Sequence, residues 1–378
     1  MLEFNKISIL IMEWNMKKYD ESLILKLQKK KRTINNNGLE IIIKESPLLE
    51  QEGYLDPIEK SLMGNNWAGP QEGGELPPLE FIIPIIRDSM GFANLNLNTE
   101  EMITKYEALE FEGNTVELWR YFKRRSDRAK KPCLVFYHGG GWVGGTPYTT
   151  ENPCKFIAEI ADAVVFNIGY SLAPEKPYPN GLNDCYSALK HIYENSKLYG
   201  IDKDRITVAG DSAGGNYAAA VTLKARDENI PMVYQQILIY PAVAMADIGV
   251  SGYEWNENEF VMSKEEEDLI RPCLGLGRPL KYGTDPMVLA YINNQKDLNN
   301  PYVSPMVAEH ISLPKTIIVV AEYDGLRIQG EFYGRQLRDA GVDVEVIRYN
   351  GVTHAFLDKL GYLPQSEDLC REIADAIR

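Results

Sequence analysis

From about residue 104 to the end of the chain, short apolar runs alternate with stretches of helical periodicity, and no other feature constrains the fold as much. The apolar runs that predict strands are residues 133–137, 164–168, 206–209, 236–240, 316–321 and 344–349. The stretches that predict helices are residues 152–161, 182–199, 214–228, 330–340 and 367–377. Apolar strands separated by helices are typical of a parallel sheet covered on both faces. We therefore expect an α/β fold with a mostly parallel central sheet flanked by helices.

Three segments stand outside this alternation. Residues 1–103 are rich in Asn, Gly, Pro and Glu, and we expect them to form an N-terminal extension and cap with a first helix near 20–31. A catalytic domain would then occupy 104–378, beginning with a hairpin of strands 104–111 and 115–123. Residues 242–310 are too long for a bare loop. We expect them to carry helices at 264–273 and 285–293 and to form a second cap or insertion segment.

Charge and cysteine usage exclude several function classes. The 40 Lys and Arg residues against 54 Asp and Glu residues give a net charge of −14. An acidic surface repels phosphate groups, which argues against nucleic-acid binding. The five cysteines are widely spaced without a C-x-x-C pair, so we expect no metal site and free thiols in a reduced compartment. The apolar run 7–12 is too short for a signal sequence or a membrane span, and we predict a cytoplasmic protein.

The most specific local motif is Gly210-Asp211-Ser212-Ala213-Gly214-Gly215, between a predicted strand and a predicted helix. A G-x-S-x-G pattern in this context is typical of a nucleophile elbow, a sharp turn that exposes a serine hydroxyl. The free N–H groups at the start of the helix would favour a nearby oxyanion. The alternative is a tight glycine turn without chemistry. We predict Ser212 as a nucleophile.

A serine nucleophile needs a base, and only His310 and His354 follow it among the four histidines. His354 follows a predicted strand, at the sheet edge where α/β active sites collect, whereas His310 precedes a strand and is expected at the surface. The acid that orients the histidine should follow the strand 316–321. Asp324 is the preferred candidate, and Glu322 is the alternative.

The segment His138-Gly139-Gly140-Gly141-Trp142, here called the glycine loop, directly follows another predicted strand. Consecutive glycines allow backbone N–H groups to point at one spot, and an H-G-G-G segment is linked to the oxyanion hole of lipases and esterases. With the N–H of Ala213, this loop would bind the anion of a tetrahedral intermediate. A phosphate-binding loop is the alternative, although no phosphate-binding glycine pattern fits.

Together these segments resemble the hormone-sensitive lipase family of α/β-hydrolases, in particular the bacterial type of carboxylesterase. The resemblance covers about residues 104–378 and also includes Tyr170-Ser-Leu-Ala-Pro-Glu175, Asp324-Gly-Leu-Arg327 and His354-Ala-Phe356. It implies an α/β-hydrolase fold with a mainly helical cap and a triad of Ser212, Asp324 and His354. It implies oxyanion donors at Gly140, Gly141 and Ala213, and a structural His138. The chain departs from the family pattern at Ser171, usually Arg, and at Ala355, usually Gly.

The expected activity is hydrolysis of short- to medium-chain carboxylic esters through an acyl-enzyme, with no cofactor. Trp142 and Tyr217 are candidates for binding the small-molecule ester. The alternatives are an acetylesterase, deacetylase or lactonase, an acyltransferase or amidase, and a non-catalytic receptor on the same fold. Because relatives often dimerise through their last strands, the resemblance also implies a homodimer contact near 344–349.

Overall fold

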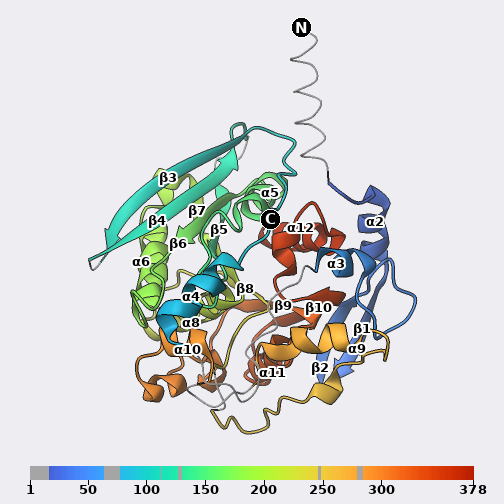
Figure 1. The fold of residues 1–378 in the computed structure, drawn as a ribbon. Coiled ribbons are helices and arrows are strands. Elements are labelled where there is room, and N and C mark those ends of the chain that lie inside the picture. Colours follow the sequence, from blue (N-terminus) through green and yellow to red (C-terminus); the bar gives the residue numbers. More distant parts are fainter. Residues whose placement is uncertain (1–16, 64–76, 112, 127–129, 246–247, 279–283) are drawn as a thin grey trace.

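The computed structural model describes residues 17–63, 77–111, 113–126, 130–245, 248–278 and 284–378. Its described strands form a single ten-stranded sheet in the order β1-β2-β10-β9-β8-β7-β5-β6-β4-β3 (Figure 1). The strands are β1 (Lys31–Asn36), β2 (Leu39–Lys44), β3 (Met102–Phe111), β4 (Asn114–Lys123), β5 (Lys131–Tyr137), β6 (Val164–Gly169), β7 (Ile201–Asp211), β8 (Gln235–Ile239), β9 (Lys315–Tyr323) and β10 (Val344–Thr353). All pairings from β2 through β6 are parallel, which confirms the predicted sheet.

Alternate residues of the central strands enter two separate hydrophobic cores. In β5, Val135 and Tyr137 join one cluster, and Leu134 and Phe136 join the other. Helices cover both faces, as the continuous apolar strands predicted. The helices are α2 (Glu21–Lys29), α3 (Pro57–Leu62), α4 (Leu79–Asp88), α5 (Glu151–Ala161), α6 (Asn180–Glu194), α7 (Ser196–Tyr199), α8 (Ala213–Asp227), α9 (Glu267–Ile270), α10 (Pro286–Tyr291), α11 (Leu326–Asp339) and α12 (Pro364–Ile377).

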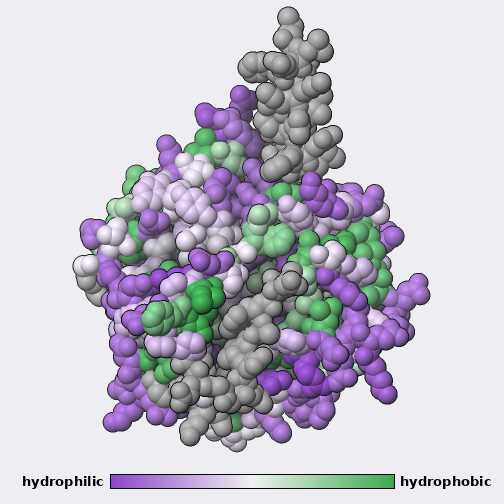
Figure 2. Space-filling view, in the orientation of Figure 1, coloured by the Kyte–Doolittle hydropathy of each residue, from purple (hydrophilic) through white to green (hydrophobic). Residues whose placement is uncertain are grey.

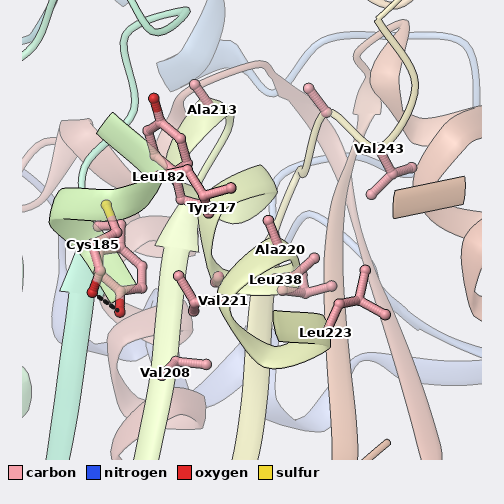
Figure 3. Packing of buried hydrophobic residues seen from close by; sticks show 14 of the residues in the cluster. Leu182, Cys185, Val208, Ala213, Tyr217, Ala220, Val221, Leu223, Leu238 and Val243 are labelled. Carbon is pink, nitrogen blue, oxygen red and sulfur yellow. Dashed lines mark hydrogen bonds between the residues drawn. The ribbon is translucent and has the colours of Figure 1, made fainter. Parts of the chain in front are cut away.

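Helix α8 is the central element of the first core. Figure 3 shows its side chains, including Tyr217, Ala220 and Val221, packed among residues of α6, β7 and β8. Helices α5 and α12 lie side by side over the opposite face of the sheet, where Ile157 and Leu369 are fully buried. The serine turn at the start of α8 is therefore held in place by the close packing of that helix.

The N-terminal region contributes strands that the sequence analysis did not predict. Strands β1 and β2 form a hairpin around Asn37-Gly38, and β2 pairs with β10 in parallel. Both turn residues have positive φ, 53° and 83°, as expected of an Asn-Gly hairpin turn. The homodimer contact implied near 344–349 would need a free strand edge there, and this part of the expectation is wrong, because β10 lies between β9 and β2. The oligomeric state and the boundary at residue 103 stay predictions.

Helices of the N-terminal region and of the 242–310 segment meet on one side of the molecule. The helices in the later segment are shorter than predicted, since α9 is followed by the 3-10 helix η2 (Arg271–Gly275) and α10 spans six residues. Helix α10 contacts α4. Figure 2 shows a small apolar patch over α4, where Phe81 and Ile85 are exposed, while Ile83 and Ile86 are buried. Among the described residues, no helix is both long and apolar enough to cross a membrane.

Candidate active site

Ser212 occupies a strained turn between β7 and α8. Its φ of 55° and ψ of −117° lie outside the regions that most residues adopt, and its backbone N–H donates to the Ile239 carbonyl at 2.9 Å. A Cβ on Gly210 would overlap the Gly214 carbonyl, and one on Gly214 would overlap the Tyr137 carbonyl. The two glycines are therefore required sterically, and the turn has the geometry of a nucleophile elbow.

A chain of hydrogen bonds links Ser212 to His354 and Asp324. The distance from His354 Nε2 to Ser212 Oγ is 2.9 Å, and from His354 Nδ1 to Asp324 Oδ2 it is 2.6 Å. A carboxylate only accepts, so Nδ1 donates to Asp324 and Nε2 of the neutral ring accepts from the serine hydroxyl. Asp324 is fully buried and also accepts the Leu326 N–H at 2.9 Å. Glu322, the alternative acid, instead accepts the Gly351 N–H at 2.7 Å.

These three residues come from widely separated parts of the sequence. Ser212 follows β7, Asp324 follows β9 and His354 follows β10, and these strands are parallel members of one sheet. Their carboxyl ends meet at one sheet edge, the usual place for a site in an open α/β fold. The glycine loop follows β5 and reaches the same edge.

The charges around His354 raise the pKa of its imidazole. Burial alone would lower the pKa of His354, but the charge and hydrogen bond of Asp324 outweigh it and raise the pKa above the ordinary value. Asp211, one residue before Ser212, accepts the Gly139 N–H at 2.8 Å. Burial raises the pKa of Asp211 to about 6. The hydrogen bond between Gly139 and Asp211 connects the glycine loop to the serine turn.

The glycine loop is folded so that two of its N–H groups are available. Gly140 and Gly141 have φ values of 127° and 57°, which favour glycine. Within the described residues, neither N–H donates to a protein acceptor, while the Gly140 carbonyl accepts from Val143 and Gly144. Ala213 is the first residue of α8, where N–H groups lack an intrahelical acceptor. These three N–H groups can therefore donate hydrogen bonds to an oxyanion.

The side chain of His138, the first residue of this loop, contacts Gly139 and Tyr170. Its Nδ1 donates to the Gly139 carbonyl at 2.8 Å, and its ring stacks on Tyr170 at 4.3 Å between centroids. The Tyr170 hydroxyl donates to the His138 carbonyl at 2.6 Å. Burial lowers the pKa of His138 to about 4, so the ring is neutral at pH 7. These contacts fit the bracing role that the resemblance implied.

Trp142 and Tyr217 are buried in an aromatic cluster. Trp142 stacks on Tyr291 at 5.0 Å, and Tyr217 packs edge-on against Tyr170 and Tyr291. Their exposed fractions are 5% and 0%, so little of either side chain is accessible, and direct contact with substrate stays a prediction. The surface position predicted for His310 is wrong, because its ring packs on Tyr333.

Residues of α4 and α10 that no sequence motif predicts contact the glycine loop and the chain just after it. A Cβ on Gly141 would overlap Met287 of α10. Arg87 of α4 donates to the carbonyls of Val143 at 2.5 Å and Ala173 at 3.0 Å, and pairs with Glu175. No motif marks these residues, because their segments have weak periodicity. A cavity of about 660 Å³ lies between α4, residues 144–149 and residues 171–176.

Known proteins resemble this chain across the site just described. A family model for the alpha/beta hydrolase fold matches residues 134–358, more than half of the chain. The chain belongs to the alpha/beta hydrolase fold family. The matched span contains the glycine loop and Ser212, Asp324 and His354, and it confirms the resemblance to hormone-sensitive lipase-like esterases. Among the described residues, no group of three or more His, Cys, Asp or Glu could hold a metal ion.

Several relatives of this alpha/beta hydrolase are named as esterases. An arylesterase of Saccharolobus solfataricus is 36% identical over 61% of this chain and 70% of its own length. Esterase LipI of Mycobacterium tuberculosis is 33% identical over 67% of this chain and 74% of its own length. A solved hyperthermophilic esterase from Pyrobaculum calidifontis aligns with a TM-score of 0.61 and 31% identity, covering 78% of this chain and 88% of that one.

Proposed function

We propose that this alpha/beta hydrolase is a serine carboxylesterase that hydrolyses short- to medium-chain esters through an acyl-enzyme. The hydrogen-bonded chain from Ser212 through His354 to Asp324 carries the proposal, because a serine hydroxyl is a weak nucleophile unless a base accepts its proton. The names of the relatives support ester hydrolysis as the reaction class. The chain-length range rests on the family resemblance.

In the proposed reaction, His354 Nε2 takes the Ser212 proton as Oγ forms a bond to the ester carbonyl carbon. The developing oxyanion accepts hydrogen bonds from the N–H groups of Gly140, Gly141 and Ala213. Collapse of the tetrahedral intermediate breaks the bond to the alcohol oxygen, which takes the proton from His354. Water then attacks the acyl-enzyme by the same route, releasing the acid and restoring the serine hydroxyl. Asp324 remains ionised and keeps the Nδ1 proton in place.

The N-terminal region and the 242–310 segment are proposed to cover this site. Met287 of α10 lies against Gly141, and Arg87 of α4 holds the chain next to the loop, so both segments approach the ester-binding side. The proposal predicts that the acyl-chain preference depends on side chains of α4 and α10.

The decisive experiment compares wild-type protein with Ser212→Ala in hydrolysis of p-nitrophenyl esters of increasing chain length. We expect the substitution to abolish turnover and labelling by a fluorophosphonate while the thermal unfolding temperature stays close to wild type. Activity near wild type in the folded variant would refute the assignment. An unlabelled wild-type protein that binds esters without turnover would instead indicate a receptor.

A further inference from the structure

A buried carboxylate from the N-terminal region contacts the loop that carries His354. Glu59 on α3 is fully buried, and it accepts the backbone N–H of Thr353 at 3.1 Å and the Thr353 hydroxyl. Both oxygens of Glu59 also accept from Lys359 Nζ at 2.7 Å. Thr353 precedes His354 directly, and Lys359 ends the following 3-10 helix, η5 (Phe356–Lys359). We call residues 353–359 the histidine loop, and Glu59 holds both of its ends.

The neighbouring residues fix α3 against β10, so Glu59 has little freedom to move. The Asp56 N–H donates to the Gly351 carbonyl at 2.8 Å. The Asp56 carboxylate caps α3 through the Ile58 N–H at 2.8 Å and accepts from Gln365 of α12 at 2.8 Å. Figure 1 shows α3 between α12 and the end of β10. The histidine loop is therefore anchored to a rigid part of the N-terminal region.

The ion pair with Lys359 also sets the charge beside the imidazole. Asp324 and Asp211 raise the pKa of His354, whereas the Lys359 ammonium lowers it. Asp358 adjoins Lys359 and Asp211. Cys273, from η2, is near Glu59, Lys359 and Asp324. Glu59 is the carboxylate that makes two short contacts with the Lys359 ammonium, so it offsets the positive charge of that ammonium, which acts on the imidazole.

We propose that Glu59 is a positioning residue for His354, which it serves by clamping both ends of the histidine loop and by neutralising Lys359. The inference rests on the proposed function, in which His354 is the base. It assigns part of the N-terminal region to catalysis, beyond covering the substrate.

The test uses three variants of the full chain: Glu59→Gln, Lys359→Gln and the double variant. The Glu59→Gln substitution keeps a side-chain oxygen for Thr353 but leaves the Lys359 charge unpaired. We expect kcat of Glu59→Gln to fall by roughly ten- to hundredfold with little change in KM, as misplaced catalytic groups do. The acid limb of the kcat/KM profile should move to lower pH by roughly half a unit. Lys359→Gln should move that limb to higher pH, and the double variant should return it towards wild type.

The matched control is Glu266→Gln. Glu266 is also buried, accepts from Leu55 N–H at 2.7 Å and pairs with Lys60 of α3, but it makes none of the contacts that tie Glu59 to the histidine loop. Rates are normalised to active sites titrated with a fluorophosphonate, so that a loss of folded protein does not imitate a loss of kcat. The control should keep both kcat per active site and the acid limb of wild type.

An unchanged kcat and acid limb in Glu59→Gln would overturn the proposal, as would equal effects in Glu266→Gln. If Glu59→Gln does not fold, Lys359→Gln and the double variant decide, because the proposal requires their acid limbs to differ in the stated direction. The Ser212→Ala variant distinguishes a failure of the proposed function from a failure of the proposed role of Glu59. Persisting activity in that variant refutes the proposed function, whereas its inactivity beside an unperturbed Glu59→Gln refutes only the role of Glu59.

Discussion

Substitution of Gly140 by alanine tests the assignment of the glycine loop most directly. The added Cβ would overlap the carbonyl group of Gly144 and lie 2.8 Å from the Gly145 nitrogen, inside the 3.0 Å that real Cβ atoms keep. Both obstacles are backbone, so the loop itself must move, on the order of 1 Å. A shift of this size costs about 100-fold in rate. Loss of one oxyanion donor costs about 100- to 1000-fold, or about 2.7–4 kcal/mol.

The assay is kcat/KM for a short p-nitrophenyl ester, normalised to serine labelled by fluorophosphonate, with thermal unfolding measured in parallel. Gly200→Ala is the matched control, because Gly200 also has positive φ, 67°, but a Cβ there meets nothing within 4 Å. Alanine at position 200 introduces backbone strain of about 1–2 kcal/mol without a steric overlap. Only Gly140→Ala should lose activity by two orders of magnitude or more. A Gly140→Ala protein with wild-type kcat/KM would refute the oxyanion role of this loop.

Further results are expected for the contacts of Arg87 and for the pH dependence. Arg87→Met should lower kcat/KM about tenfold, because three acceptors lose their donor. Glu175→Gln should lower kcat/KM less, since both carbonyl bonds to Arg87 remain. Equal losses in the two variants would contradict a role of Arg87 through the chain next to the glycine loop. For pH dependence, the base must be neutral, so activity is present above the pKa of His354 and is lost as pH falls through it. Because Asp324 raises that pKa, the acid limb should lie above the ordinary histidine value of about 6.5. Asp324→Asn should move the acid limb to lower pH and reduce kcat by roughly 10⁴-fold. An acid limb at the wild-type pH in this variant would mean that a group other than His354 produces the limb.

Local patterns were sufficient for the elements on which the site is built. The six predicted parallel strands are present, because a strand buried on both faces needs a continuous apolar run. The sequence predicted the serine turn because only glycine fits at positions 210 and 214. The hairpin β1–β2 was not predicted, although Asn37-Gly38 marks its turn, because its first strand, Lys31–Asn36, has the polar composition of a loop.

The choice between Asp324 and Glu322 needed the tertiary structure. Both acids follow the predicted strand 316–321, and their separation of two residues does not reveal which side chain reaches His354. In the fold, Asp324 bonds the imidazole at 2.6 Å, while Glu322 bonds the Gly351 N–H. The buried positions of His310, Trp142 and Tyr217 likewise depend on packing between distant elements.

The sequence by itself determined the fold class and predicted the serine turn and the glycine loop, since each is encoded by neighbouring residues with a local steric or periodic requirement. Only the tertiary structure decided which acid bonds His354, that β2 pairs with β10, that Glu59 contacts the histidine loop and that Arg87 bonds the chain next to the glycine loop. These contacts join residues separated by dozens to hundreds of positions. Their geometry follows from how whole elements pack, and no short stretch of sequence specifies it.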